Sequence, residues 1–167
     1  GFICLYQMTL LLLIVLPIIK CGPGSNPLSG TDFLLALMVL ALVALETWAD
    51  QEQWNFQAEK KRRKAEGEPL DGIFKDGFIQ HGVWSLSRHP NYLAEQSIWV
   101  VFYLFSVVAS GLNWTVAGCL LLILLFQGSS SLSQGLHVQK SPAYPDYQTR
   151  VPRFVPRLPR RQAPAAP

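Results

Sequence analysis

The stretch Phe33–Leu45, FLLALMVLALVAL, decides the fold class because it contains no charged or polar side chain. Three similar runs lie at 2–19, 97–109 and 115–126, and half of the 167 residues are hydrophobic whereas 15% are charged. A helix needs about 20 mostly apolar residues to cross a bilayer, and these runs reach that length once their amphipathic ends are included. The sequence therefore predicts an all-α integral membrane protein with four transmembrane helices, at about residues 2–19, 31–57, 91–109 and 114–133.

Signals at the ends of the runs define the expected organisation. Thr31 and Asp32 suit the start of the second helix, Pro90 the start of the third and Gly111 its end, whereas Pro17 kinks or ends the first. We interpret residues 1–159 as one helical domain, the C-terminal part of a larger bundle, and residues 160–167 as a disordered tail. Prolines alternate with arginines after Tyr144, which predicts an extended surface segment.

The start of the chain and its charges predict further features. The chain opens inside an apolar run without the pattern of a signal peptide, so we expect an N-terminal portion to be missing. Basic residues are concentrated between the second and third runs and after the fourth, which places the long loop and the C-terminal tail in the cytoplasm. The run Lys60–Lys64 is interpreted as a topology determinant in contact with lipid headgroups, not with nucleic acid.

The second predicted helix carries a polar stripe at its end. Glu46 lies about 22 Å along a crossing of about 30 Å, still at membrane depth. Asp50, Gln53 and Gln57 follow at helical spacing, so the four side chains share one face. Ionisable groups at this depth indicate a functional site, and the alternative is a polar face where the helix leaves the membrane.

A second polar cluster runs from Gly82 to Glu95 into the third predicted helix. Free backbone N–H groups at the helix start, together with Arg88 and His89, form a natural site for a phosphate or diphosphate. Asn91 and Glu95 are four residues apart and so are placed to bond a ribose or an amide. The alternative is a basic membrane anchor with a helix cap.

The cysteines and histidines do not predict a metal site or a disulfide framework. The cysteines are odd in number, and the histidines have no partners at metal-ligand spacing. These residues are Cys4, Cys21, Cys119, His81, His89 and His137.

Three segments in this order resemble the DUF1295 and steroid 5-alpha-reductase C-terminal group of membrane proteins. They are Glu46 with Ala49-Asp50-Gln51, Gly82 to Glu95 with its Ser-Arg-His-Pro-Asn-Tyr core, and Tyr144-Pro-Asp-Tyr-Gln to Phe154-Val-Pro. The resemblance covers about residues 31–159. It implies an NADPH-dependent reductase of an electron-poor double bond in a sterol-like or other lipidic enone, with the nucleotide at the cytoplasmic helix ends.

The resemblance also implies roles for individual residues. Asp50, Asn91 and Glu95 are expected to bind the cofactor, while Arg88, His89 and Tyr92 hold phosphates or shape the nicotinamide pocket. Tyr92 is the one candidate catalytic residue. Gln134 departs from the acidic residue of many relatives, and the proton-donating groups are expected in N-terminal helices that this chain lacks. The cofactor-binding set is Glu46, Asp50, Gln53, Arg88, His89, Asn91, Tyr92 and Glu95.

Two other functions stay open at this point. The Arg-His-Pro-x-Tyr pattern is also similar to membrane methyltransferases, such as the isoprenylcysteine carboxyl and phospholipid enzymes, which bind S-adenosylmethionine. A non-catalytic membrane subunit that keeps the fold, with a membrane-protein partner, is the third. The expected surroundings are a lipid bilayer, most simply the endoplasmic reticulum, with another organelle or a bacterial inner membrane as alternatives, and a hydrophobic small-molecule substrate.

Overall fold

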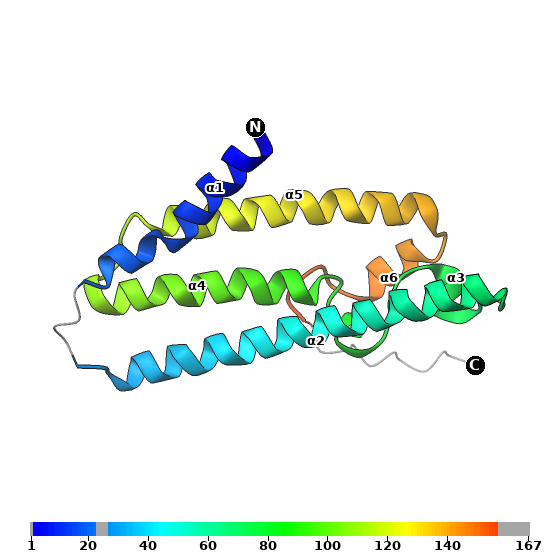
Figure 1. Cartoon of the computed structure of the whole chain (residues 1–167), viewed down its shortest axis with the longest axis horizontal. Helices are drawn as coiled ribbons and strands as arrows, with labels where there is room; N and C mark the ends of the chain where they lie inside the picture. Colours follow the sequence, from blue (N-terminus) through cyan, green and yellow to red (C-terminus); the bar gives the residue numbers. More distant parts are fainter. Residues whose placement is uncertain (1, 23–26, 157–167) are drawn as a thin grey trace, which may run out of the picture.

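The computed structural model describes residues 2–22 and 27–156, and within these ranges all regular secondary structure is helical (Figure 1). The prediction of an all-α fold is therefore confirmed. The elements are α1 (Phe2–Val15), η1 (Leu16–Lys20), α2 (Gly30–Glu66), α3 (Gly72–Asp76), η2 (Gly82–Ser85), α4 (Pro90–Ser110), α5 (Val116–Lys140) and α6 (Tyr144–Arg150).

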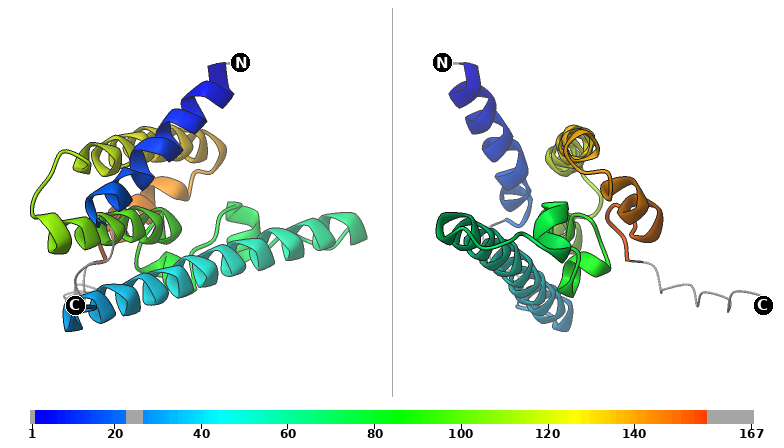
Figure 2. Two further views of the ribbon diagram at one scale, coloured as in Figure 1. Left: turned by 60° about the vertical axis from the view of Figure 1, so that its left-hand side comes forward. Right: turned by 90° about the vertical axis from the view of Figure 1, so that its right-hand side faces the viewer.

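The three long helices lie side by side, with α4 between α2 and α5, while α1 crosses over α5 (Figures 1 and 2). The crossing of α1 is close because Gly118 of α5 has no side chain. A Cβ atom there would lie 2.3 Å from the carbonyl oxygen of Leu13, so the backbones of the two helices rest against each other.

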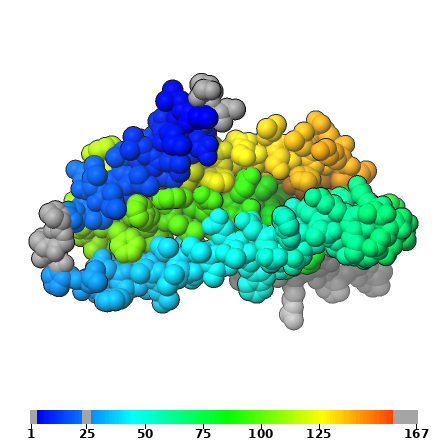
Figure 3. All heavy atoms as spheres, in the orientation of Figure 1, coloured from blue at the N-terminus to red at the C-terminus, as the bar shows by residue number. Residues whose placement is uncertain are grey.

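Within the described residues, α2, α4 and α5 are long and apolar enough to cross a membrane. The fourth predicted crossing differs: α1 and η1 together form a shorter apolar segment, and the α-helix ends at Val15 before Pro17, as the proline predicted. Leu34, Leu37 and Leu40 of α2 are exposed, as expected for contact with lipid. Figure 3 shows α2 along one long edge of the molecule.

Helix α2 begins one residue earlier, and ends nine residues later, than the sequence predicted. Ser29 is the N-cap, and Asp32 is the third helical residue of a capping box; Thr31 does not cap. The helix has 37 residues and ends at Glu66. Its C-cap is Gly67 in the left-handed conformation, which glycine adopts without strain because it has no side chain. At about 1.5 Å per residue it is about 55 Å long, well beyond a hydrocarbon core of about 30 Å.

The basic run at the end of α2 is engaged within the protein. Arg62 and Arg63 pair with Glu59, and the two arginines also reach Glu66, Glu68 and Asp71. Lys60 donates to the carbonyl of Gly77, which joins the helix to the loop beyond α3. These contacts hold the segment after α2 back along that helix, so that η2 lies against α2.

The prediction of an extended segment after Tyr144 was wrong, because residues 144–150 form α6. Pro145 is tolerated in the first turn, where its missing N–H would have no helical partner. Tyr144 and Tyr147 of α6 pack with Phe78 and Val151 in a buried cluster. The prediction of a disordered tail at 160–167 lies outside the described residues.

Candidate functional site

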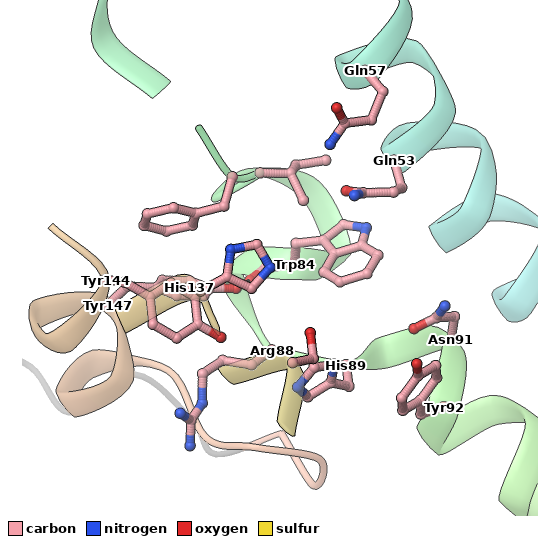
Figure 4. A pocket seen from close by; sticks show the side chains of 13 residues that line it. Gln53, Gln57, Trp84, Arg88, His89, Asn91, Tyr92, His137, Tyr144 and Tyr147 are labelled. Atoms are coloured by element: carbon pink, nitrogen blue, oxygen red, sulfur yellow. The ribbon is translucent and has the colours of Figure 1, made fainter. Parts of the chain in front are cut away.

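A cavity of about 210 Å³ lies where α2, η2, the start of α4, the end of α5 and α6 meet (Figure 4). In this view Gln53, Gln57 and Asn91 line one side, and Arg88 and Tyr144 lie on the other. The cavity is lined by Gln53, Gln57, Phe78, Ile79, Trp84, Arg88, His89, Asn91, Tyr92, Ser133, His137, Tyr144 and Tyr147.

The segment Ser87–His89, which we call the anion loop, enters α4 through Pro90, the first residue of that helix. Arg88 donates from Nη1 to the side-chain oxygen of Gln134 on α5, and Gln148 donates to the same oxygen over 3.1 Å. The amide nitrogen of Gln134 lies 3.1 Å from Nε2 of His89. One buried glutamine thus connects the loop with both α5 and α6.

The charge of the anion loop resides on Arg88. Burial, reinforced by Arg88 and Arg153, lowers the pKa of His89 to about 4, so this ring is neutral at pH 7. Because the Gln134 amide donates to it, Nε2 of His89 acts as the acceptor. Burial also lowers the pKa of Arg88, yet a guanidinium stays protonated in proteins. The loop therefore presents one fixed positive charge next to a neutral imidazole.

Asp50 and Asn91 join α2 to α4 at the edge of the cavity. Asn91 donates from Nδ2 to Oδ1 of Asp50 over 3.0 Å, so the polar stripe on α2 contacts α4 at this point, where Asp50 itself is exposed. Among the described residues, Oδ1 of Asn91 is buried without a hydrogen-bond partner, as are Oε1 of Gln53 and Nε of Arg88. Unpaired buried polar atoms are costly and uncommon, so three on the residues of one cavity mark it as the candidate functional site.

Aromatic rings form the remaining walls and are held in place. The Trp84 indole donates to the carbonyl of Ala49 over 3.1 Å, and the Tyr147 hydroxyl donates to the carbonyl of Trp84. The Tyr92 ring lies between those of His89 and Phe126, with centroids 5.2 and 4.6 Å away. Burial raises the pKa of Tyr144 and of Tyr147, so both phenols are neutral.

Glu52 positions η2 beneath the cavity. Its carboxylate accepts from the backbone N–H of Val83 over 3.0 Å and from the Trp48 indole over 3.0 Å. Gly82 has φ +58, and a Cβ atom there would lie 2.0 Å from Oε1 of Glu52. Because glycine has no side chain, the Glu52 carboxylate can reach the backbone at this turn. The position of the turn then determines the position of Trp84.

The structure brings five of the eight predicted cofactor-binding residues into the cavity wall, and Asp50 adjoins it through Asn91. The other two, Glu46 and Glu95, lie near each other between α2 and α4 outside that wall, where Glu95 accepts from the Trp99 indole over 3.4 Å. The five residues in the wall are Gln53, Arg88, His89, Asn91 and Tyr92.

Sequence reasoning missed most of the aromatic wall. Trp84, His137, Tyr144 and Tyr147 were not predicted as site residues, although the Tyr-Pro-Asp-Tyr segment was part of the resemblance. The signal was available, since two tyrosines three residues apart fall on one face of a helix. In the described part of the chain, no group of three or more His, Cys, Asp or Glu side chains is arranged to hold a metal ion.

Comparison with known proteins identifies relatives along most of the chain. The model of the family described as "Protein of unknown function (DUF1295)" matches residues 2–151. An uncharacterized protein of Schizosaccharomyces pombe is 34% identical over 168 residues, which cover 94% of this chain and 48% of the relative. The chain thus spans about half the length of that relative. No solved structure matches.

Proposed function

This chain belongs to the DUF1295 family, and from that premise we propose that it is the nucleotide-binding part of an NADPH-dependent membrane oxidoreductase. The reaction we propose is reduction of an electron-poor C=C bond in a sterol-like or other lipidic enone. One observation carries the proposal: three buried polar atoms without partners, Arg88 Nε, Gln53 Oε1 and Asn91 Oδ1, belong to residues that line one cavity.

The residues present fit the polar groups of NADPH. Its phosphates are hydrogen-bond acceptors that suit the guanidinium of Arg88, and its carboxamide offers N–H donors that suit the free oxygens of Asn91 and Gln53. A volume of about 210 Å³ is below the roughly 300–1,000 Å³ of sites for drug-sized ligands, so the cavity encloses a part of the dinucleotide. The flat rings of Trp84 and Tyr92 suit a planar heterocycle.

The bound cofactor supplies a hydride, and the chain supplies orientation, a dry environment and a proton. Asp50 holds Asn91 in a single orientation through their hydrogen bond, so the free oxygen of that amide keeps its direction. Among the hydrogen bonds of the described residues, none involves the Tyr92 hydroxyl, whereas the Tyr147 hydroxyl is committed to Trp84. Tyr92 is thus the candidate donor of the proton that completes reduction.

The membrane setting is compatible with a lipidic substrate. Three helices are long and apolar enough to cross a bilayer, and the cavity lies beside the part of α2 that follows its apolar run. We place this end in the cytoplasm, and the endoplasmic reticulum is our proposed membrane. The substrate pocket and the activity of the whole protein are proposed to involve the segments beyond this chain, which spans about half of its relative.

The test is equilibrium binding of NADPH and of S-adenosylmethionine to the detergent-solubilised chain. We expect NADPH to bind and both Asn91→Ala and Asp50→Ala to weaken it about tenfold or more, the effect of losing roughly 1.4 kcal/mol. Gln51→Ala is the matched control, because this exposed amide of α2 bonds, among the described residues, only Asn55. Preference for S-adenosylmethionine would establish the methyltransferase alternative, and binding of neither nucleotide would favour a non-catalytic subunit.

Tyr92→Phe separates binding from chemistry. The substitution keeps the ring between His89 and Phe126 and removes only the hydroxyl. We expect unchanged NADPH affinity and loss of enone reduction by the full-length protein. Unchanged turnover would show that the proton comes from another group.

A further inference from the structure

The segment Val151–Phe154, which we call the C-terminal strap, follows α6 and lies along the anion loop. The backbone N–H of Arg88 donates to the carbonyl of Pro152 over 2.9 Å, and the Ser87 hydroxyl donates to the carbonyl of Arg153 over 3.3 Å. The rings of His89 and Phe154 are 5.9 Å apart. All three residues of the anion loop therefore contact the strap, although more than 60 positions separate them in the sequence.

The strap is itself anchored on α5 by the side chain of Arg153. Its Nε donates to the hydroxyl of Ser130 over 2.9 Å, and its Nη2 donates to Ser131 over 2.6 Å and to the carbonyl of Gln127. Ser130 is fully buried, so the inner end of this contact lies within the protein. A guanidinium is suited to the task because its several N–H donors are held in a rigid plane.

Two independent connections thus join the anion loop to one face of α5. The first runs from the Arg88 guanidinium to Gln134, and the second runs from the Arg88 backbone through the strap to Ser130. Gln134 and Ser130 are four residues apart, so they lie one above the other on the helix. The side chain and the backbone of Arg88 are therefore each held by a different route.

We infer that Arg153 is a positioning residue, whose contact with Ser130 and Ser131 holds the anion loop in the form that binds the anionic part of the ligand. The inference rests on the proposed function, in which Arg88 meets a phosphate. It adds a role for the strap, which lies outside the cavity wall and to which the sequence analysis assigned no function. Arg153 acts through the backbone of the loop and does not itself touch the ligand.

The experiment compares Arg153→Lys, Arg153→Gln and Ser130→Ala with the wild type in two assays. Hydrogen exchange of the free protein reports on the peptide that contains the Arg88 N–H. Titration with NADPH, and separately with inorganic pyrophosphate, reports on ligand affinity. Arg150→Gln is the matched control, because this exposed arginine lies three residues away and, within the part of the chain that the structure describes, pairs only with Asp146 on α6.

We expect at least tenfold faster exchange at Arg88 and at least tenfold weaker binding in all three variants, with Arg150→Gln unchanged. Arg153→Lys is the decisive variant, since it keeps the charge and loses the planar set of donors. In an Arg88→Ala background, Arg153→Lys should cause no further loss of affinity. A role in overall stability, or direct hydrogen bonds from the Arg153 guanidinium to the ligand, would instead give an added loss there.

The outcomes separate this inference from the proposed function. The positioning role is overturned if Arg153→Lys leaves the exchange at Arg88 unchanged, or if it binds NADPH as tightly as the wild type. The proposal that NADPH is the cofactor is unaffected by either result. Pyrophosphate binding that depends on Arg153 without NADPH binding supports the strap and rejects NADPH. Failure of the wild type to bind either probe overturns both.

Discussion

Gln134 is the residue on which the geometry of the site depends most, and Gln134→Leu measures that dependence. The substitution removes an acceptor shared by Arg88 and Gln148 and a donor to His89, all in a side chain that is 8% exposed. A hydrogen bond to a charged group contributes about 1.5–3 kcal/mol and a neutral one about 1 kcal/mol. The added apolar burial offsets about 1 kcal/mol. The expected net loss is about 2–4 kcal/mol.

Thermal unfolding in detergent is the assay, and a loss of this size lowers the midpoint by roughly 5–15 °C for a chain of this length. Gln148→Ala removes a single bond of the network and should lower it by only a few degrees. Gln134→Glu keeps the shared acceptor and gains an ion pair with Arg88 but loses the donor to His89, so it should lower the midpoint less than Gln134→Leu does. A midpoint for Gln134→Leu within 1 °C of the wild type would refute the reasoning.

Three further predictions concern individual contacts. Gly82→Ala should displace the Glu52 carboxylate and lower the unfolding midpoint, whereas Gly72→Ala, also at positive φ but with no atom within 4 Å, should have a smaller effect. Gly118→Val should separate α1 from α5 and lower the stability of the protein by about 2 kcal/mol through overpacking. Faster proteolysis of α1 would detect this separation. Gly128→Ala, at a position with open space, should leave the stability unchanged or raise it. Folding lowers the pKa of His89 from 6.5 to about 4. The folded state therefore keeps its full stability above pH 6.5 and loses up to about 3 kcal/mol as the pH falls to 4. The variant His89→Gln should flatten this part of the profile of stability against pH.

Where local chemistry decides the structure, the sequence was sufficient to predict it. Pro90 begins α4 and Gly111 ends it, as their conformational limits required. The polar spacing on α2 predicted contact with the rest of the protein, and Gln53 lines the cavity while the exposed Asp50 bonds Asn91 of α4. The end of α2 was missed because a highly charged sequence resembles a loop, although its i,i+3 and i,i+4 pairs, such as Arg62 with Glu59 and Glu66, support a helix.

Contacts between distant segments could not be predicted in the same way. The prolines after Tyr144 suggested that no helix would form, yet positions 146–150 are free of proline and supply five of the seven residues of α6. That short helix is stabilised by packing on Phe78, which lies more than 60 residues earlier in the chain. The role of Gln134 depends in the same way on contacts from the anion loop and from α6, which no spacing in the sequence reveals.

The length of α2 has a consequence for the order in which reactants meet. The helix continues without a break from its apolar run, which suits a bilayer, into a polar stretch, which suits water. Gln53 and Gln57 lie on this polar stretch. Under the proposed function, a water-soluble reductant therefore does not have to dissolve in hydrocarbon, and a lipid substrate does not have to leave it. Under the proposed function the chain works as a phase-transfer catalyst, whose turnover is governed by two separate concentrations, one in bulk solution and one per area of membrane.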